Sequence, residues 1–165
     1  MAGSLYTVTM ASATVIASGE IITIRAATAL SSRASILQIY SMSCGQHGTS
    51  TSQELGIRWG LKASAFSTMS TATPAPTIQG IVASAITGST SGAASSCGVN
   101  SSSNGAGAFT VMGQEGFNNL NGWLKIFTPE ERPIVLIDQT FTLALVGTPT
   151  TLTNWEAMLT FEEIT

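Results

Sequence analysis

The chain has 165 residues and a mass of 17.0 kDa, which is the size of one ordinary domain. It is 44% hydrophobic and only 9% charged, whereas an average domain carries about 25% charged residues, and this excludes the charge-rich kind of intrinsic disorder. The net charge of −3, with no clusters of Lys and Arg, argues against nucleic acid as a partner.

The sequence indicates neither a membrane helix nor an export signal. No apolar run approaches the roughly 18–20 residues that a membrane-spanning helix needs, and the start of the chain lacks the basic and apolar regions of a secretory signal. Cys44 and Cys97 lie in Gly- and Ser-rich sequence that predicts loops. We expect two free thiols, with a disulfide between them as the open alternative.

The dominant hydrophobic period is two, which predicts β-strands. The predicted strands, in chain order, are Leu5–Met10, Glu20–Ala26, Ala34–Met42, Leu55–Lys62, Ile78–Ile86, Ala108–Met112, Trp123–Phe127, Ile134–Ile137, Thr140–Leu145 and Trp155–Glu162. Turn sequences rich in Gly, Pro and Asn separate most of them. About eight to ten short strands with such punctuation predict a single all-β domain, an antiparallel sandwich or barrel.

Four segments depart from this pattern. Ser67–Thr77 and Gly88–Gly107 are predicted to be long irregular loops, the first of them extended because of its prolines. Thr128–Arg132 fits one helical turn, with Thr as N-cap and Pro at the first helical position. Gln114–Leu120 is a second candidate for a short helical turn.

Candidates for catalysis and metal binding are few. His47 is the only imidazole and Asp138 the only aspartate, and no G-x-S-x-G motif marks a serine nucleophile. Cys44 and His47 have a spacing that occurs among metal ligands, and Cys97 could add a third, but a structural zinc site needs four. We therefore interpret His47 as a residue of a polar hairpin loop and expect no metal, no cofactor and no enzymatic activity.

Trp59, Trp123 and Trp155 could stack on sugar rings, as in carbohydrate-binding sandwiches. Trp59 and Trp155, however, lie on the apolar face of clearly alternating strands. Core packing is the favoured interpretation of both, and a carbohydrate-binding sandwich stays open as an alternative function.

The predicted surface is unusual because Ser, Thr, Ala, Gly and Gln take the outward positions. Monomeric proteins normally rely on charged side chains there, whereas small neutral side chains cost little entropy and little desolvation when a partner covers them. We expect a protein that sits in an assembly. The apolar start, with Leu5, Tyr6, Val8 and Met10, is either an interface strand or the first strand of the domain's own sheet.

Three parts of the chain carry a resemblance. They are the strand-turn-strand block Ala34–Ala63, the Pro-containing loop Thr73–Pro76, and the ending Phe141–Ile164, whose last strand closes in an aromatic-Glu-Glu motif. In this order the chain resembles virion structural proteins of tailed bacteriophages that have a jelly-roll-like β-sandwich. The resemblance implies capsid decoration (cement) proteins, or other head and tail proteins, without catalytic residues.

We therefore expect residues 1–165 to form one jelly-roll-like antiparallel sandwich that acts as a non-enzymatic capsid decoration protein. Its expected partners are the major capsid protein and further copies of itself, as a homotrimer or homodimer, and neither nucleic acid nor a membrane. Its expected place is the capsid exterior, after synthesis in the host cytoplasm. A tail or fibre-attachment protein is the structural alternative.

Overall fold

The computed structural model describes residues 3–15, 19–48, 51–63, 66, 69–77, 82–90, 92–101 and 107–164. Within these ranges the secondary structure is β, apart from one 3-10 turn, η1 (Arg33–Ser35). The strands are β1 (Ser4–Val15), β2 (Glu20–Arg25), β3 (Ile36–Gln46), β4 (Glu54–Lys62), β5 (Ser70–Thr71), β6 (Ala75–Pro76), β7 (Thr87–Gly88), β8 (Ser96–Val99), β9 (Phe109–Asn118), β10 (Trp123–Ile126), β11 (Ile134–Val135), β12 (Thr140–Val146) and β13 (Leu152–Ile164).

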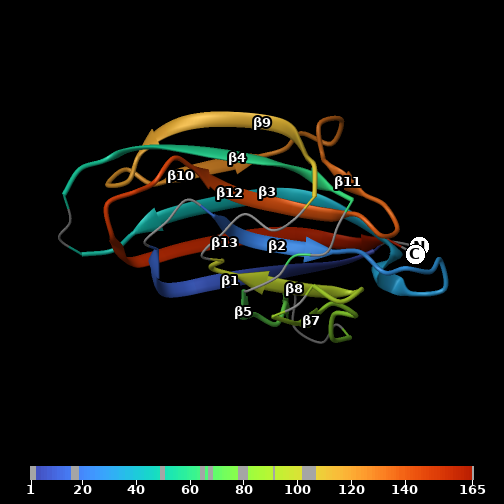
Figure 1. The fold of residues 1–165 in the computed structure, drawn as a ribbon. Helices are drawn as coiled ribbons and strands as arrows, with labels where there is room; N and C mark the ends of the chain where they lie inside the picture. The colour runs from blue at the N-terminus through green and yellow to red at the C-terminus, as the bar shows by residue number, and fades with distance from the viewer. Residues whose placement is uncertain are drawn as a thin grey trace.

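The strands form two sheets that lie one over the other (Figure 1). The first sheet has the order β10-β3-β13-β1-β6, with β11 also paired to β3. The second sheet has the order β5-β8-β2-β12-β4-β9, with β7 also paired to β8. All the pairings are antiparallel except that of β7 with β8. The prediction of an all-β antiparallel sandwich is confirmed.

The order of the main strands is that of a jelly roll, in which two four-stranded sheets are built from two Greek keys. One half is β10-β3-β13-β1 and the other is β2-β12-β4-β9. Among the first four strands, β1 and β3 belong to the first sheet and β2 and β4 to the second, so the chain crosses between the sheets at each step. It crosses three more times later, between β9 and β10, between β10 and β12, and between β12 and β13. The first and last strands are therefore neighbours, with Ser4 opposite Glu163.

Alternation along the strands builds the core between the sheets. On β13, Trp155, Ala157, Leu159 and Phe161 are all buried, as predicted from the period of two. Their partners in the core come from both sheets and include Tyr6, Val8, Leu37, Ile39, Ile22, Ile24, Ile57, Phe141 and Leu143. The aromatic rings also meet across the sandwich, since the centroids of Trp59 on β4 and Trp123 on β10 lie 5.6 Å apart.

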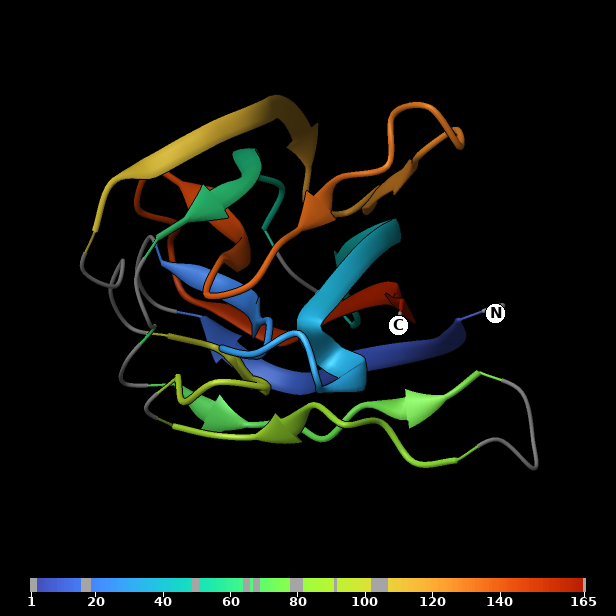
Figure 2. The same ribbon diagram turned by 90° about the vertical axis from the view of Figure 1, so that its right-hand side faces the viewer.

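One edge of the sandwich is closed by the segment from β5 to β7 (Figure 2). In this segment β6 pairs with β1 of the first sheet, whereas β5 and β7 pair with β8 of the second. The Pro-containing stretch Ser67–Thr77 was expected to be an irregular, extended loop, and the extended conformation is found at β5 and β6, which are short paired strands within it. Residues 67 and 68 lie outside the described residues. Because its strands are only two residues long, sequence alternation gave no sign of them.

Several local predictions are wrong. The stretch Gly88–Gly107, expected to be a loop, contains the fully buried strand β8, which pairs with β2. The segment Gln114–Leu120, expected to be a helical turn, continues β9 to Asn118, because its backbone pairs with β4 along the whole length of that strand. The single turn expected at Thr128–Arg132 is present, as a hydrogen-bonded turn in which the Glu131 amide donates to the Thr128 carbonyl (3.0 Å), but it is not assigned as a helix.

The predicted strand Ile78–Ile86 is also not found where the structure describes it. Residues 78–81 lie outside the described residues, and Val82–Ile86 is not a strand. Side chains hold this part of the chain instead of a neighbouring strand: Arg33 donates to the Ala83 carbonyl (2.6 Å), and the Ala85 amide donates to the Glu163 carboxylate (2.9 Å). The apolar residues of Val82–Ile86 thus favoured a strand, but within the described residues this stretch pairs with no other strand.

Candidate functional site

The four residues predicted as an interface belong to the core strand β1. Tyr6, Val8 and Met10 are buried, and Leu5 is half-buried. β1 pairs with β13 on one side and with β6 on the other, so it is a strand of its own sheet, the second of the two alternatives stated above. The Tyr6 hydroxyl donates to the Val82 carbonyl (2.9 Å). The role of this strand in an interface stays a prediction, with Leu5 as the one side chain of the four that reaches the surface.

His47 lies on the outer side of the first sheet, directly after β3. Its Nε2 is 2.8 Å from Glu156 Oε2, and the side chains are 70% and 43% exposed. Ser43 lines the same shallow groove of about 310 Å³, but within the described part of the chain its hydroxyl makes no hydrogen bond to His47. A nucleophile and base in hydrogen-bond contact, as a serine hydrolase requires, are therefore not assembled there.

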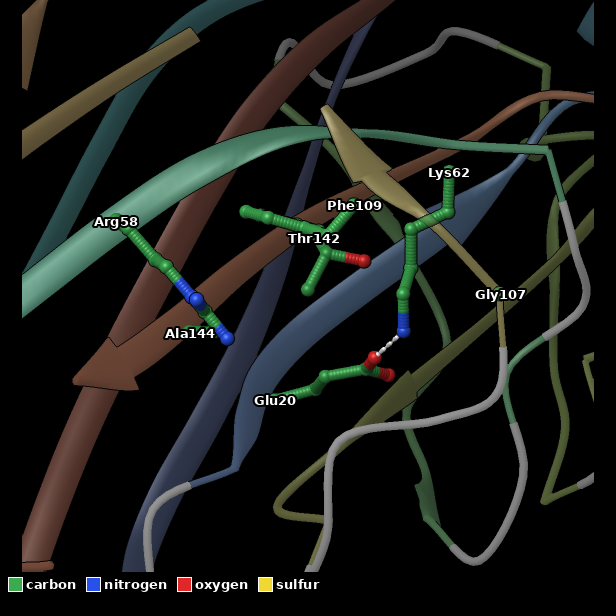
Figure 3. A pocket seen from close by; sticks show the side chains of 7 residues that line it. All are labelled: Glu20, Arg58, Lys62, Gly107, Phe109, Thr142 and Ala144. Carbon is green, nitrogen blue, oxygen red and sulfur yellow. Dashed lines mark hydrogen bonds and ion pairs between the residues drawn. The ribbon is translucent and has the colours of Figure 1, made fainter. Parts of the chain in front are cut away.

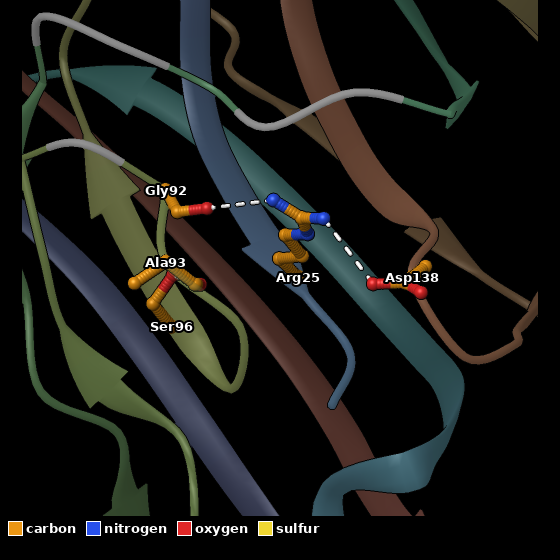
Figure 4. Close-up of polar contacts among 5 residues, drawn as sticks. All are labelled: Arg25, Gly92, Ala93, Ser96 and Asp138. Carbon is orange, nitrogen blue, oxygen red and sulfur yellow. Dashed lines mark hydrogen bonds and ion pairs between the residues drawn. The ribbon is translucent and has the colours of Figure 1, made fainter. Parts of the chain in front are cut away.

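Asp138 lies elsewhere and has a structural partner. Its carboxylate accepts from Arg25 Nη2 (3.3 Å), while Nη1 of the same guanidinium donates to the Gly92 carbonyl (3.0 Å), as Figure 4 shows. Beside them, the hydroxyl of Ser96, the first residue of β8, donates to the Ala93 carbonyl. Arg25 thus ties the end of β2 to two loops, and Asp138 does not approach His47 as a triad would need.

The two cysteines are free and buried in different sheets, Cys44 in β3 and Cys97 in β8, rather than in loops as predicted. The expectation of free thiols is confirmed. Burial raises the pKa of both thiols, that of Cys97 to about 12. Cys44 packs in the core while His47 is exposed, and among the described residues no group of three or more His, Cys, Asp and Glu side chains gathers as a metal site.

The three tryptophans pack in the core. Trp155 is fully buried, Trp59 is 5% exposed and Trp123 is 9% exposed. The Trp123 Nε1 donates to Glu115 Oε2 (2.9 Å), and Lys125 Nζ lies 5.6 Å from the ring centre of Trp59. The favoured interpretation of Trp59 and Trp155 is confirmed, because a sugar needs an exposed ring face and these rings present almost none.

A buried ion pair lies on the side of the second sheet that faces away from the core. The Lys62 ammonium donates to Glu20 Oε1, and the Thr23 hydroxyl donates to Oε2 (3.3 Å), in a site where both charged side chains are at most 3% exposed. They border a cavity of about 160 Å³, which Figure 3 shows with its lining residues Glu20, Arg58, Lys62, Gly107, Phe109, Thr142 and Ala144. Lys62 lies on the face of β4 opposite to that of Ile57 and Trp59, and it is buried because this face of the second sheet is covered as well.

The opposite surface of the molecule is open. Strand pairing aligns Leu124, Ser43, Met158 and Thr9 in one row across four strands, and Ile126, Ser41, Thr160 and Thr7 in the next. Paired residues of antiparallel strands share a face, so these eight residues form one surface, which we call the outer face. Its apolar members are well exposed: Leu124 62%, Ile126 67% and Met158 40%.

The outer face carries no charged residue in its two rows, and charges appear only around it. His47 and Glu156 lie at one end. At the other end, the Tyr40 hydroxyl donates to Glu162 (2.5 Å), and this hydrogen bond, followed by burial, raises the pKa of Tyr40. Sequence reasoning did not single out Leu124 or Ile126, because the strand Trp123–Phe127 is apolar at nearly every position and its alternation is ambiguous.

Within the described ranges, no helix has the length and apolar character needed to cross a membrane. Comparison with protein-family models, with curated proteins and with solved structures found no match.

Proposed function

We propose that this chain is a non-enzymatic virion protein that decorates the exterior of a bacteriophage capsid. The observation that carries the proposal is the outer face, a broad sheet surface with exposed Leu124, Ile126 and Met158 among Ser and Thr side chains and without a charge in either row. Such a patch on a soluble domain is typical of an interaction surface.

The chemistry of the outer face suits permanent burial against a protein. Its apolar side chains gain about 25 cal/mol for each Å² removed from water. Its hydroxyl side chains lose little conformational entropy on burial, and no charge has to be desolvated. We propose the assembled major capsid protein as the occupant of this face, with homotrimers or homodimers as the bound form. A protein that binds only the assembled shell stabilises that shell by mass action.

Two further considerations support a structural role. The jelly-roll order of the strands is used by many viral capsid domains, although fold alone does not decide function. The sequence resemblance to phage virion proteins points in the same direction. Carbohydrate binding gains no support from the site, since the three tryptophans that would stack on sugar are at most 9% exposed.

The test is quantitative mass spectrometry of purified virus particles together with a rebinding assay. We expect the chain in a fixed ratio to the major capsid protein, in hundreds of copies per particle, and we expect the purified chain to rebind to particles stripped of it but not to unassembled capsid subunits. A copy number typical of a single small ring would instead indicate the tail or fibre-attachment alternative. Absence of the chain from particles would overturn the proposal.

A further inference from the structure

The cavity beside the buried ion pair contains a second cation, Arg58, for which the described residues provide no ion-pair partner. Arg58 reaches into it from β4, and the Nε of its guanidinium is buried without a hydrogen-bond partner among the residues that the structure describes. Within the described residues this guanidinium makes no hydrogen bond or ion pair, and its Cζ lies 4.8 Å from the centre of the Phe109 ring. Figure 3 shows the side chain pointing toward Ala144 and Glu20. Buried donors are nearly always satisfied in native proteins. In the described part of the chain, Arg25, Arg132 and Trp155 also have a buried nitrogen without a hydrogen bond, and Arg58 differs from these three in lining this cavity.

The neighbouring acid is already engaged. Glu20 accepts from Lys62 at one carboxylate oxygen and from the Thr23 hydroxyl at the other. The cavity is thus lined by two cations and one carboxylate, which leaves one positive charge in excess. Its volume of about 160 Å³ is several times the roughly 30 Å³ that one water occupies in the liquid. There is room for a small organic anion.

We propose that this cavity is a binding site for a single carboxylate group, held by the Arg58 guanidinium. The planar fork of an arginine matches the two oxygens of a carboxylate, and such charge-assisted pairs are strong. One excess positive charge balances a monoanion, whereas a doubly charged phosphate would meet the Glu20 carboxylate with its second charge uncompensated. The rest of the lining suits the carbon atoms of the ligand, since Phe109, Ala144 and Gly107 offer apolar atoms.

The carboxylate can come from two sources with the same chemistry: a small free carboxylic acid, or the side chain of Glu or Asp on a protein partner. Acetate represents the first, and N-acetyl-glutamate N-methylamide, whose backbone is blocked, represents the second. Each is titrated into the isotopically labelled full chain at constant ionic strength, with chloride as the replaced anion. The readout is the chemical shift of the Arg58 Nε–H and of the backbone amides of Phe109 and Ala144.

The variants are Arg58→Gln, Arg58→Lys and the matched control Arg132→Gln. Arg132 resembles Arg58 in two ways: its buried Nε has no hydrogen-bond partner among the described residues, and its guanidinium stacks on a ring, that of Tyr40 at 3.7 Å. It does not line this cavity. We expect saturable shifts for the unaltered chain and for the control. We expect an affinity weaker by about tenfold or more in both Arg58 variants, because glutamine loses the charge and lysine loses the fork.

Binding of acetate alone would identify a free acid as the ligand, and binding of both probes would identify a site that also accepts an acidic side chain. Two results would overturn the proposal: no saturable shift in the unaltered chain, or equal binding by Arg58→Gln. If Arg58→Gln does not fold, the positions of the chemical-shift changes in the unaltered chain test the proposal. Changes confined to residues other than Arg58, Phe109 and Ala144 would show that the carboxylate binds elsewhere.

Discussion

Two glycines of β9 lie three residues apart and have opposite surroundings. A Cβ on Gly113 would lie 2.2 Å from Cζ2 of Trp59, whereas a Cβ on Gly116 would meet only the Leu55 carbonyl oxygen, at 3.9 Å. The indole of Trp59 therefore occupies the space that any larger residue at position 113 would need. The requirement for glycine at this position comes from a side chain on the neighbouring strand, since β9 pairs with β4.

Gly113→Ala is expected to lower the free energy of unfolding by about 1–3 kcal/mol, because the added methyl group displaces the Trp59 ring or the strand. Gly116→Ala is the matched control in the same strand and should change stability by less than about 0.5 kcal/mol. Chemical denaturation of both variants measures the difference. Equal stabilities would show that Trp59 does not pack on Gly113.

The buried ion pair of Glu20 and Lys62 should contribute more to the stability of the fold than an exposed pair does. Lys62→Met leaves the Glu20 carboxylate buried without its main counter-charge, and loss of one partner of a buried pair costs about 3–5 kcal/mol. Lys125→Met makes the same change in a pair with Glu115 whose side chains are 32% and 42% exposed, and it should cost less than about 1 kcal/mol. Urea denaturation compares the two; losses of similar size would contradict the burial of the first pair.

Strand β8 shows how an element can form from a sequence that gives little local sign of it. Its residues Ser96–Val99 lie in a Gly- and Ser-rich stretch, yet all four are buried. The strand pairs with β2 on one side and with the short β5 and β7 on the other. A Cβ on Gly98 would lie 2.8 Å from both Met69 and Phe66, so these two side chains cover the strand at its glycine.

The burial of β8 predicts an alkaline loss of stability through Cys97. Its pKa is raised to about 12 in the folded protein, whereas a thiol in the unfolded chain ionises near pH 8.5. The stabilisation is complete below about pH 8.5 and is lost as the pH rises toward 12, because only the unfolded state ionises in that window. Cys44 has a pKa shifted in the same direction and adds its own share.

Between about pH 7.5 and pH 9.5 the Cys97 thiol alone should account for a fall of about 1.4 kcal/mol in the free energy of unfolding. Cys97→Ser lacks this ionisation while keeping a donor for the Ala72 carbonyl, which accepts from the thiol. Denaturation of the unaltered chain and of the variant at the two pH values measures the effect. An equal fall in both proteins would show that the thiol is accessible.

At the scale of the whole molecule, the two sheets differ in what covers their outward sides. The second sheet is buried on both sides along β2 and β12, whereas the first exposes the outer face. The proposed contact with a capsid shell therefore belongs to the first sheet. Its most exposed apolar residues, Leu124 and Ile126, both come from β10.

The double substitution Leu124→Glu and Ile126→Glu is expected to weaken rebinding to stripped particles by at least about tenfold, because it places two charges in the contact that must be desolvated. Leu30→Glu is the control, since Leu30 is 76% exposed and lies outside the outer face. Thermal unfolding verifies that both variants are folded, and co-sedimentation with particles measures binding. Rebinding unaffected by the double substitution would place the contact elsewhere.

Much of the architecture could be predicted from residue patterns alone. Alternation identified the long strands and the inward side chains of β13, and the turn sequences between strands indicated a sandwich. The same reasoning interpreted Trp59 and Trp155 correctly as core residues. It failed at β8 and at the second half of β9, where pairing with a distant strand overrides a local sequence rich in Gly and polar residues.

The amino-acid sequence by itself determined the all-β class, the strands with a clear period of two and the low charge of the surface. The tertiary structure decided which side of each sheet is covered: Lys62 is buried although it is charged, and Leu124 and Ile126 are exposed although they are apolar. The physical reason is that a period of two assigns residues to two faces of a strand. Which of these faces meets the core, solvent or another segment depends on contacts between strands far apart in the chain.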